Sequence, residues 1–191
     1  MAEKKKRKGR RAYLNDFHVG LNGEYTYTGP VYRYVGELPY PQALKRLRLL
    51  VAAMCLAMIG AGVVPAPSMV GFGNFYVVPF FMIELVGVAL ATWSAYRLIS
   101  GGENLRAYVY EATVNKLPQR LEMTFFFAAA CVVVNIVYLC LNGFGGKVFL
   151  SLLLIVFHVG VGAAAQITRK TLTLLRWNTG REEEELPEHE E

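Results

Sequence analysis

The hydrophobic positions of this chain gather into four long apolar segments, at residues 49–64, 75–96, 123–141 and 148–167. A hydrocarbon core about 30 Å thick is crossed by roughly 20 helical residues, and each segment comes near that length. No charged residue occurs between Leu49 and Ile83. That stretch is too long for one span, and proline and glycine residues between 65 and 73 break it. The pattern predicts an all-α protein, a bundle of four transmembrane helices. A soluble four-helix bundle is the alternative, but its helices would need polar faces that these segments lack.

A second break, Asn142 to Lys147, again has the composition of a turn, so the four spans form two helical hairpins joined by a polar stretch. This organisation divides the chain into six parts. They are a basic tail (1–23), a tyrosine-rich hairpin with a proline-containing linker (24–42), a first transmembrane hairpin (43–99), an amphipathic loop (100–122), a second transmembrane hairpin (123–168) and a C-terminal tail that is acidic at its end (169–191).

Lys and Arg residues are distributed very unevenly around these segments. Eleven precede Leu49, four lie between Arg97 and Arg120, and four follow Ile167, whereas the 142–147 loop holds one and the 65–74 loop none. Cytoplasmic flanks of membrane helices retain basic residues. The distribution therefore predicts a multi-pass protein of the cell membrane with both termini and the middle loop in the cytoplasm.

The two tails carry opposite charges. The N-terminal one has seven basic residues, Lys4, Lys5, Lys6, Arg7, Lys8, Arg10 and Arg11. With membrane spans following, the nearest polyanion is the anionic inner leaflet, which attracts a nearby basic residue by about 1 kcal/mol; nucleic acid is not expected as a partner. The alternative is a solvated tail that only enforces orientation. The apolar run begins about forty residues later, so no cleavable signal is expected. The acidic tail, 182–191, should be repelled by the same lipids.

Residues 24–35 alternate around Gly29-Pro30, which predicts a small cytoplasmic β-hairpin before the first span. With those two residues as the loop, four rings lie on one side of the ribbon, those of Tyr25, Tyr27, Tyr32 and Tyr34. An isolated two-stranded ribbon is only marginally stable in water. The rings are therefore expected to pack at the lipid headgroups, with a protein-binding surface as the alternative.

Two connecting segments have readable patterns. Residues 38–41, Leu-Pro-Tyr-Pro, are expected to be extended because prolines disfavour helix at the residue before them. Residues 103–115 are expected to form an amphipathic surface helix that ends at Lys116, Leu117 and Pro118. Its apolar stripe should face lipid, with a partner groove as the alternative.

Small residues recur every four positions along three of the spans, which lets helix backbones approach closely. They are Ala53, Ala57 and Ala61 on the first, Gly87, Ala91 and Ala95 on the second, and Gly160 and Ala164 on the fourth. These stripes are expected to define the hairpin interfaces, within one chain or between two chains.

Glu84 is the sharpest functional lead, because a carboxylate at a span centre costs roughly 2.5 to 3.5 kcal/mol on insertion scales and must be neutral, paired or wet. It lies nine residues from the outer end of its span, and His158 lies ten residues from the outer end of the fourth, so the two could meet. Asn135 is about 5 Å shallower by the helical rise. Together these residues form a candidate intramembrane polar site that could bind a cation or pass a proton. Interhelical hydrogen bonding with a purely structural role is the alternative.

Other chemistry is sparsely represented. The cysteines Cys55, Cys131 and Cys140 all lie in predicted spans, and the last two, roughly 13 Å apart along one helix, are beyond disulfide reach. No CxxC pair, His/Cys cluster, nucleotide-binding motif or hydrolase motif is recognisable in the sequence. We therefore expect no cofactor and no metal, and the pattern does not favour an enzyme.

These observations leave a choice of function. A non-catalytic accessory or assembly component of a membrane complex fits the small-residue stripes, the tyrosine segment and the charged ends. A small oligomeric transporter or channel subunit using the Glu84 and His158 site is the alternative. Expected partners are the anionic inner leaflet and either another membrane protein or further copies of the chain.

Overall fold

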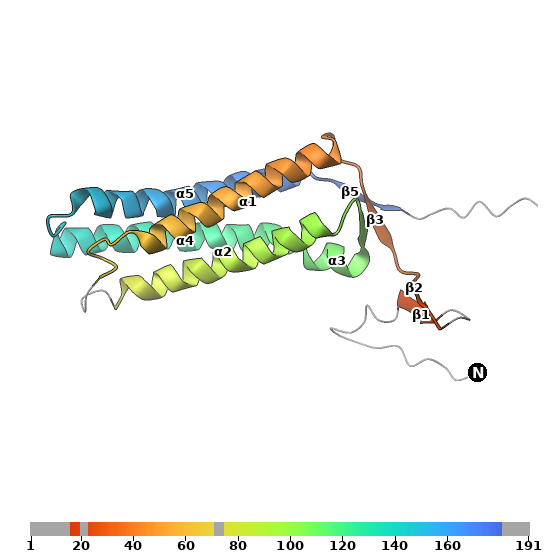
Figure 1. Cartoon of the computed structure of the whole chain (residues 1–191), viewed down its shortest axis with the longest axis horizontal. Helices are drawn as coiled ribbons and strands as arrows, with labels where there is room; N and C mark the ends of the chain where they lie inside the picture. Colours follow the sequence, from red (N-terminus) through yellow and green to blue (C-terminus); the bar gives the residue numbers. More distant parts are fainter. Residues whose placement is uncertain (1–15, 20–22, 71–74, 181–191) are drawn as a thin grey trace, which may run out of the picture.

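The predicted four apolar helices are present in the computed structural model, which describes residues 16–19, 23–70 and 75–180. They are α1 (Tyr40–Val63), α2 (Val77–Ser100), α4 (Leu117–Asn142) and α5 (Val148–Thr173), each long and apolar enough to cross a membrane. The short helix α3 (Ala107–Ala112) precedes α4. Figure 1 shows the four long helices side by side, with α3 and all the strands at one end.

Two of the long helices begin with a proline in their first turn, contrary to the expectations for those segments. α1 begins at Tyr40 and contains Pro41, and α4 begins at Leu117 and contains Pro118. The first-turn N–H groups of a helix have no intrahelical acceptor, so proline loses nothing there and its fixed φ favours helix. Pro118 therefore begins a helix instead of ending one, and the amphipathic helix predicted over 103–115 is reduced to α3.

The four long helices pack in a ring with one weak side. α5 packs on both α1 and α4, and α4 also packs on α2, whereas α1 and α2 contact each other sparsely. The buried core runs the length of the ring and includes Leu47, Met54, Leu98, Leu121 and Leu154. Consecutive helices α4 and α5 thus form a tight pair, while α1 and α2 remain loosely joined.

The small residues do mark close approaches, but between other helices than expected. A Cβ on Gly160 of α5 would meet the Ala57 Cβ of α1 at 3.5 Å, and a Cβ on Gly87 of α2 would lie 3.5 Å from the Thr124 Cα of α4. Ala61, Ala91, Ala95 and Ala164 are buried, whereas Ala53 is exposed. The stripes on α1 and α2 thus serve interfaces with the other hairpin, where both contacting surfaces are smooth enough for close packing.

In the described part of the chain, five short strands form two small sheets at the end of the helices that carries α3. β1 (Phe17–Val19) pairs with β2 (Tyr25–Tyr27), and β3 (Val31–Tyr34) is the central strand between β4 (Asn104–Arg106) and β5 (Trp177–Gly180), all antiparallel. The three-stranded sheet therefore joins the segment before α1, the middle segment and the segment after α5. We call it, with α3, the cap.

The predicted hairpin between residues 24 and 35 is wrong, because β2 and β3 pair with other strands and not with each other. Two-residue hairpin loops need left-handed φ at their first residue, and Gly29 does not have it. Pro30, with its φ fixed near −65°, is also unsuited to the second position of the favoured type I′ turn. The Gly29-Pro30 pair instead carries the chain from one sheet to the other.

The four tyrosines consequently do not share one face. Tyr32 stacks on Tyr110 of α3, with ring centroids 4.0 Å apart, and Tyr34 packs edge-on against Trp177 of β5. Burial raises the pKa of Tyr34, and its protonated hydroxyl donates to the Leu38 carbonyl at 2.8 Å. Tyr27 packs on Phe17 and its hydroxyl accepts a hydrogen bond from the Ala107 N–H, while Tyr25 is 76% exposed. Three of the rings hold the cap together and one is free to contact other molecules.

Several expectations concern residues outside the described part of the chain. They include the basic run from Lys4 to Arg11, the acidic tail 182–191 and the glycines at 71 and 73. Among the described residues, Lys and Arg lie in the cap, in the segments next to it or in the cap-side halves of the long helices, except Lys147 at the start of α5.

Candidate intramembrane site

Glu84 and His158 meet inside the bundle. Glu84 is on α2 and His158 on α5, and the Glu84 Oε2 atom lies 2.6 Å from the His158 Nδ1 atom. Both side chains are almost fully enclosed, at 0% and 1% exposure. α2 and α5 are not among the extensively packed helix pairs, so this contact bridges the bundle across its middle. A proton shared between carboxylate and imidazole lowers the cost of burying either charge alone.

The contact leaves much hydrogen-bonding capacity unused. Although the two atoms are at ion-pair distance, their geometry is not that of a hydrogen bond, and the thiol of Cys131 is placed to donate to the Glu84 carboxylate. The second ring nitrogen of His158, Nε2, is also buried and has no hydrogen-bond partner among the described residues. A buried polar atom left unsatisfied costs about 1 to 3 kcal/mol. Such groups are commonly explained by a functional role, a bound water or a bound ion.

The third member of this cluster is Cys131 on α4. One ligand atom each from Glu84, Cys131 and His158 all lie within 4.8 Å of one another, and the three residues are buried. We call these three residues the polar cluster. They come from three different helices, and the His158 ring also packs edge-on against Phe81 of α2, at 6.2 Å between ring centroids.

Asn135, the third residue expected at this site, instead joins a second polar group nearer the α1–α2 loop. Its side-chain oxygen accepts a hydrogen bond from the Ser68 hydroxyl at 2.6 Å, and its amide donates to the Cys131 carbonyl at 2.9 Å. Tyr138, one turn further along, donates to the Pro67 carbonyl at 3.1 Å. Asn135 therefore fixes the α1–α2 loop to α4. Cys131, one turn away on the same helix, is the α4 residue that lies beside Glu84 and His158.

The sequence reasoning missed Cys131 because it examined cysteines only for disulfides and local metal motifs. No His and Cys cluster is recognisable in the sequence, because ligands that come from three helices leave no short sequence pattern. The number of residues between each side chain and the outer end of its span did point to Cys131. Cys131 lies ten residues before Leu141, the predicted outer end of its span, which is the same depth as His158 and one turn deeper than Asn135.

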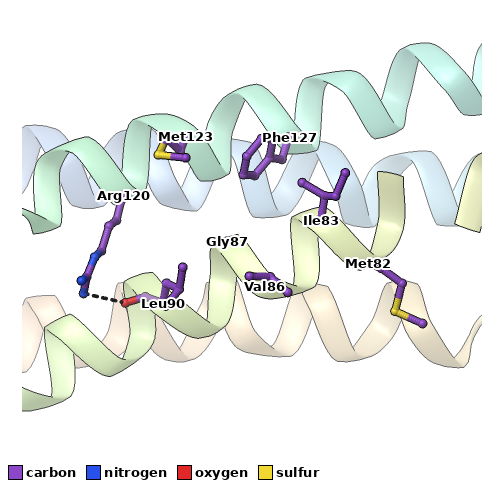
Figure 2. A pocket seen from close by; sticks show the side chains of 8 residues that line it. All are labelled: Met82, Ile83, Val86, Gly87, Leu90, Arg120, Met123 and Phe127. Carbon is purple, nitrogen blue, oxygen red and sulfur yellow. Dashed lines mark hydrogen bonds between the residues drawn. The ribbon is translucent and has the colours of Figure 1, made fainter. Parts of the chain in front are cut away.

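Two apolar grooves run along α2, one on each side. The α2–α4 groove, of about 350 Å³, is shown in Figure 2 and is lined by Met82, Ile83, Val86, Gly87, Leu90, Arg120, Met123 and Phe127. Arg120 closes one end, where its guanidinium donates to the Leu90 carbonyl at 3.4 Å and to the Ser94 hydroxyl. Arg120 thus donates to a backbone carbonyl and a side-chain hydroxyl of α2 and links α4 to that helix.

The α1–α2 groove is larger, about 790 Å³, because these helices are the loosely joined pair. Its lining is almost wholly apolar and consists of Cys55, Met58, Ile59, Gly62, Phe81, Leu85, Val88, Ala89, Thr92, Trp93 and Tyr96. The polar atoms of Cys55 and Thr92 satisfy each other, with 3.3 Å between sulfur and oxygen. The groove therefore presents a surface suited to apolar contact.

Comparison of the chain with protein-family models, with curated proteins and with solved structures finds no match. Its function therefore has to be argued from the polar cluster, the grooves and the cap.

Proposed function

We propose that the protein is a multi-pass component of the cell membrane that crosses the bilayer four times as two helical hairpins. Both termini and the 100–122 segment, and hence the cap, lie in the cytoplasm. In this proposal the protein acts as a non-catalytic accessory or assembly subunit of a membrane complex. The apolar helices support the crossing, and the concentration of Lys and Arg at the cap end supports the orientation. The same charge favours contact with the anionic inner leaflet.

The α1–α2 groove is the observation that carries the accessory role. A closed four-helix bundle buries four interhelical interfaces, and here the fourth is left largely open. Helices associate in lipid through close van der Waals packing, for which Gly62 and Ala89 leave room. A helix of a partner membrane protein fits this opening, with a second copy of the chain as the alternative occupant.

Filling the groove tests this role. Ala89→Trp places a large ring in the groove, whereas Val159→Trp places the same ring on α5, where Val159 is 53% exposed and outside the groove lining. Native mass spectrometry of each variant, extracted from its own membranes, should show that Ala89→Trp loses a stoichiometric partner helix and that Val159→Trp keeps it. A wild-type particle that is a lone monomer, or a partner retained by both variants, would reject the accessory role.

Cysteine labelling tests the orientation separately. Single cysteines at Phe144, in the α4–α5 loop, and at Asn178, in β5, are placed in a variant lacking the three native cysteines. A membrane-impermeant maleimide added to intact cells should label position 144 and spare position 178 until the cells are opened. Labelling of position 178 in intact cells would reverse the proposed orientation.

Transport is the second candidate, and the Glu84–His158 contact favours it. An acidic residue inside a membrane helix commonly marks an ion or proton path. Because four helices enclose little aqueous space, the transporting unit would be an oligomer. In proteoliposomes, Glu84→Gln should abolish cation or proton flux and leave protein yield unchanged; a wild-type protein that moves neither would remove this candidate.

A further inference from the structure

We propose that Glu84, Cys131 and His158 form a binding site for a divalent metal ion of zinc type. The first support is geometric. Carboxylate, thiol and imidazole atoms from three helices lie within 4.8 Å of one another, which is close enough to share one ion. This site is independent of the accessory role, and it deepens the transport candidate by naming its cation.

Unsatisfied polar atoms are the second, independent support. Both ring nitrogens of His158 are buried and make no well-formed hydrogen bond to a described residue. A purely structural hydrogen-bonded bridge would be expected to satisfy these atoms. The enclosure of His158, at 1% exposure, also keeps lipid and bulk water from doing so.

The donor set selects the kind of metal. One oxygen, one sulfur and one nitrogen ligand suit a borderline-soft cation such as Zn²⁺, whereas Mg²⁺ and Ca²⁺ prefer sites made of oxygen atoms. Three protein ligands also leave the fourth tetrahedral position available for water or another ligand.

Charge balance favours a divalent ion at this depth. A Glu84 carboxylate and a Cys131 thiolate together carry two negative charges, and neutral His158 adds none. One Zn²⁺ therefore makes the complex neutral, which avoids the large cost of burying net charge in a low-dielectric interior. Binding to the protonated cluster releases two protons, one from the thiol and one shared between the carboxylate and the imidazole.

The adjustment needed for binding is small. With bonds of about 2.0 to 2.1 Å, two light-atom ligands of one tetrahedral ion lie roughly 3.3 Å apart. Glu84 Oε2 and His158 Nδ1 are 2.6 Å apart, so a modest rotation of the glutamate side chain admits the ion.

Elemental analysis and cobalt spectroscopy of the full chain in detergent test the proposal. The protein is purified with a tag free of histidine, from cells grown with added zinc, and zinc per chain is measured. Replacing zinc by Co²⁺ should give the visible bands of a tetrahedral ion together with thiolate-to-cobalt charge transfer. We expect about one metal ion per chain.

Cys131→Ser should remove the charge-transfer band and weaken binding by at least about tenfold, since even supporting residues of metal sites commonly have effects of that size. Cys140→Ser, at an exposed cysteine of the same helix, is the matched control that should keep both signals. A second ligand variant, Glu84→Gln, should weaken binding while leaving the charge-transfer band of any bound cobalt. Circular dichroism and size-exclusion profiles identify variants that fail to fold. Wild-type protein that binds neither Zn²⁺ nor Co²⁺, or a charge-transfer band that persists in Cys131→Ser, would overturn the site.

Discussion

Glu84 on α2 and His158 on α5 touch at 2.6 Å, although their helices are not among the closely packed pairs of the bundle. The contact is therefore made by side chains reaching across the centre, and it depends on the other helices to hold α2 and α5 at the right separation. The thiol of Cys131 on α4 lies within 4.8 Å of both side chains. A polar interaction placed this way links one half of the chain to the other.

A double-mutant cycle should detect this link. With a chelator present, Glu84→Gln, His158→Gln and the double variant are unfolded with a denaturing detergent, and the coupling free energy is obtained from the three differences. Interhelical hydrogen bonds in membranes average about 0.6 kcal/mol. Because this contact is fully enclosed and involves ionisable groups, we expect about 1 to 2 kcal/mol. A coupling near zero would mean that the two side chains do not interact.

Adding side-chain volume at Gly87 should separate α2 from α4. A Cβ there would lie 3.0 Å from the Phe127 ring and 3.2 Å from the Thr124 hydroxyl, so a leucine has to push these two α4 side chains aside. Overpacking of this kind costs about 1 to 3 kcal/mol. Gly62→Leu is the control, since Gly62 is exposed and a Cβ there would meet the Phe81 ring at 3.4 Å, an ordinary van der Waals distance. Thermal unfolding of the isolated protein should show a lower midpoint for Gly87→Leu than for Gly62→Leu, and equal midpoints would contradict the close approach.

Removing the Tyr32 ring should loosen the cap. Tyr32 stacks on Tyr110 at 4.0 Å with nearly parallel planes, and such aromatic pairs contribute about 0.5 to 1.5 kcal/mol beyond their buried area. In Tyr32→Ala, hydrogen exchange at β4 and β5 should become faster while exchange in α4 and α5 is unchanged. Tyr25→Ala should leave all of these rates unaltered, because Tyr25 is 76% exposed. A cap that exchanges at wild-type rates without the Tyr32 ring would show that the stacking does not support it.

Two arginines that both lie near the cap end of a long helix, Arg120 on α4 and Arg169 on α5, should differ in their effect on stability. Arg120 donates to the Leu90 carbonyl and to the buried Ser94 hydroxyl, whereas Arg169 pairs with Glu122 where both side chains are 40% exposed. Hydrogen bonds from a charged donor contribute about 1.5 to 3 kcal/mol, and exposed ion pairs about 0 to 1 kcal/mol. Arg120→Gln should therefore lower the unfolding midpoint in detergent more than Arg169→Gln. The reverse order would show that Arg120 does not fasten α4 to α2.

The helices and part of the site were predictable because their signals are local. Twenty apolar residues need a helix in lipid whatever they pack against, and helical rise alone placed Glu84 and His158 at one depth. Depth also favoured Cys131 over Asn135, because Cys131 lies ten residues from the outer end of its span, as His158 does, and Asn135 only six. Rotation about each helix axis is not fixed by rise, so depth alone did not show which side chains face one another. Which residue of α4 meets Glu84 and His158 depends on how α4 packs on α2 and α5.

The strands were less predictable for a related reason. The alternation around Gly29-Pro30 correctly indicates extended structure at Tyr25–Tyr27 and Val31–Tyr34, but the partners of these strands lie elsewhere in the chain. β3 pairs with residues near 105 and near 178, and no local rule identifies such distant partners. The Gly29-Pro30 pair was more informative than the alternation about pairing, because proline at the second loop position disfavours a tight hairpin.

The pairing of β3 with β5 constrains how the protein is made. A ribosome synthesises β3 before α1 and β5 after α5, so the central strand of the sheet leaves the exit tunnel long before its last neighbour exists. One of its edges stays open throughout insertion of the helices, and open edges invite pairing with other chains. The sheet can therefore be completed only once Trp177–Gly180 has been synthesised, and a chain truncated before Trp177 would keep that edge of β3 unpaired.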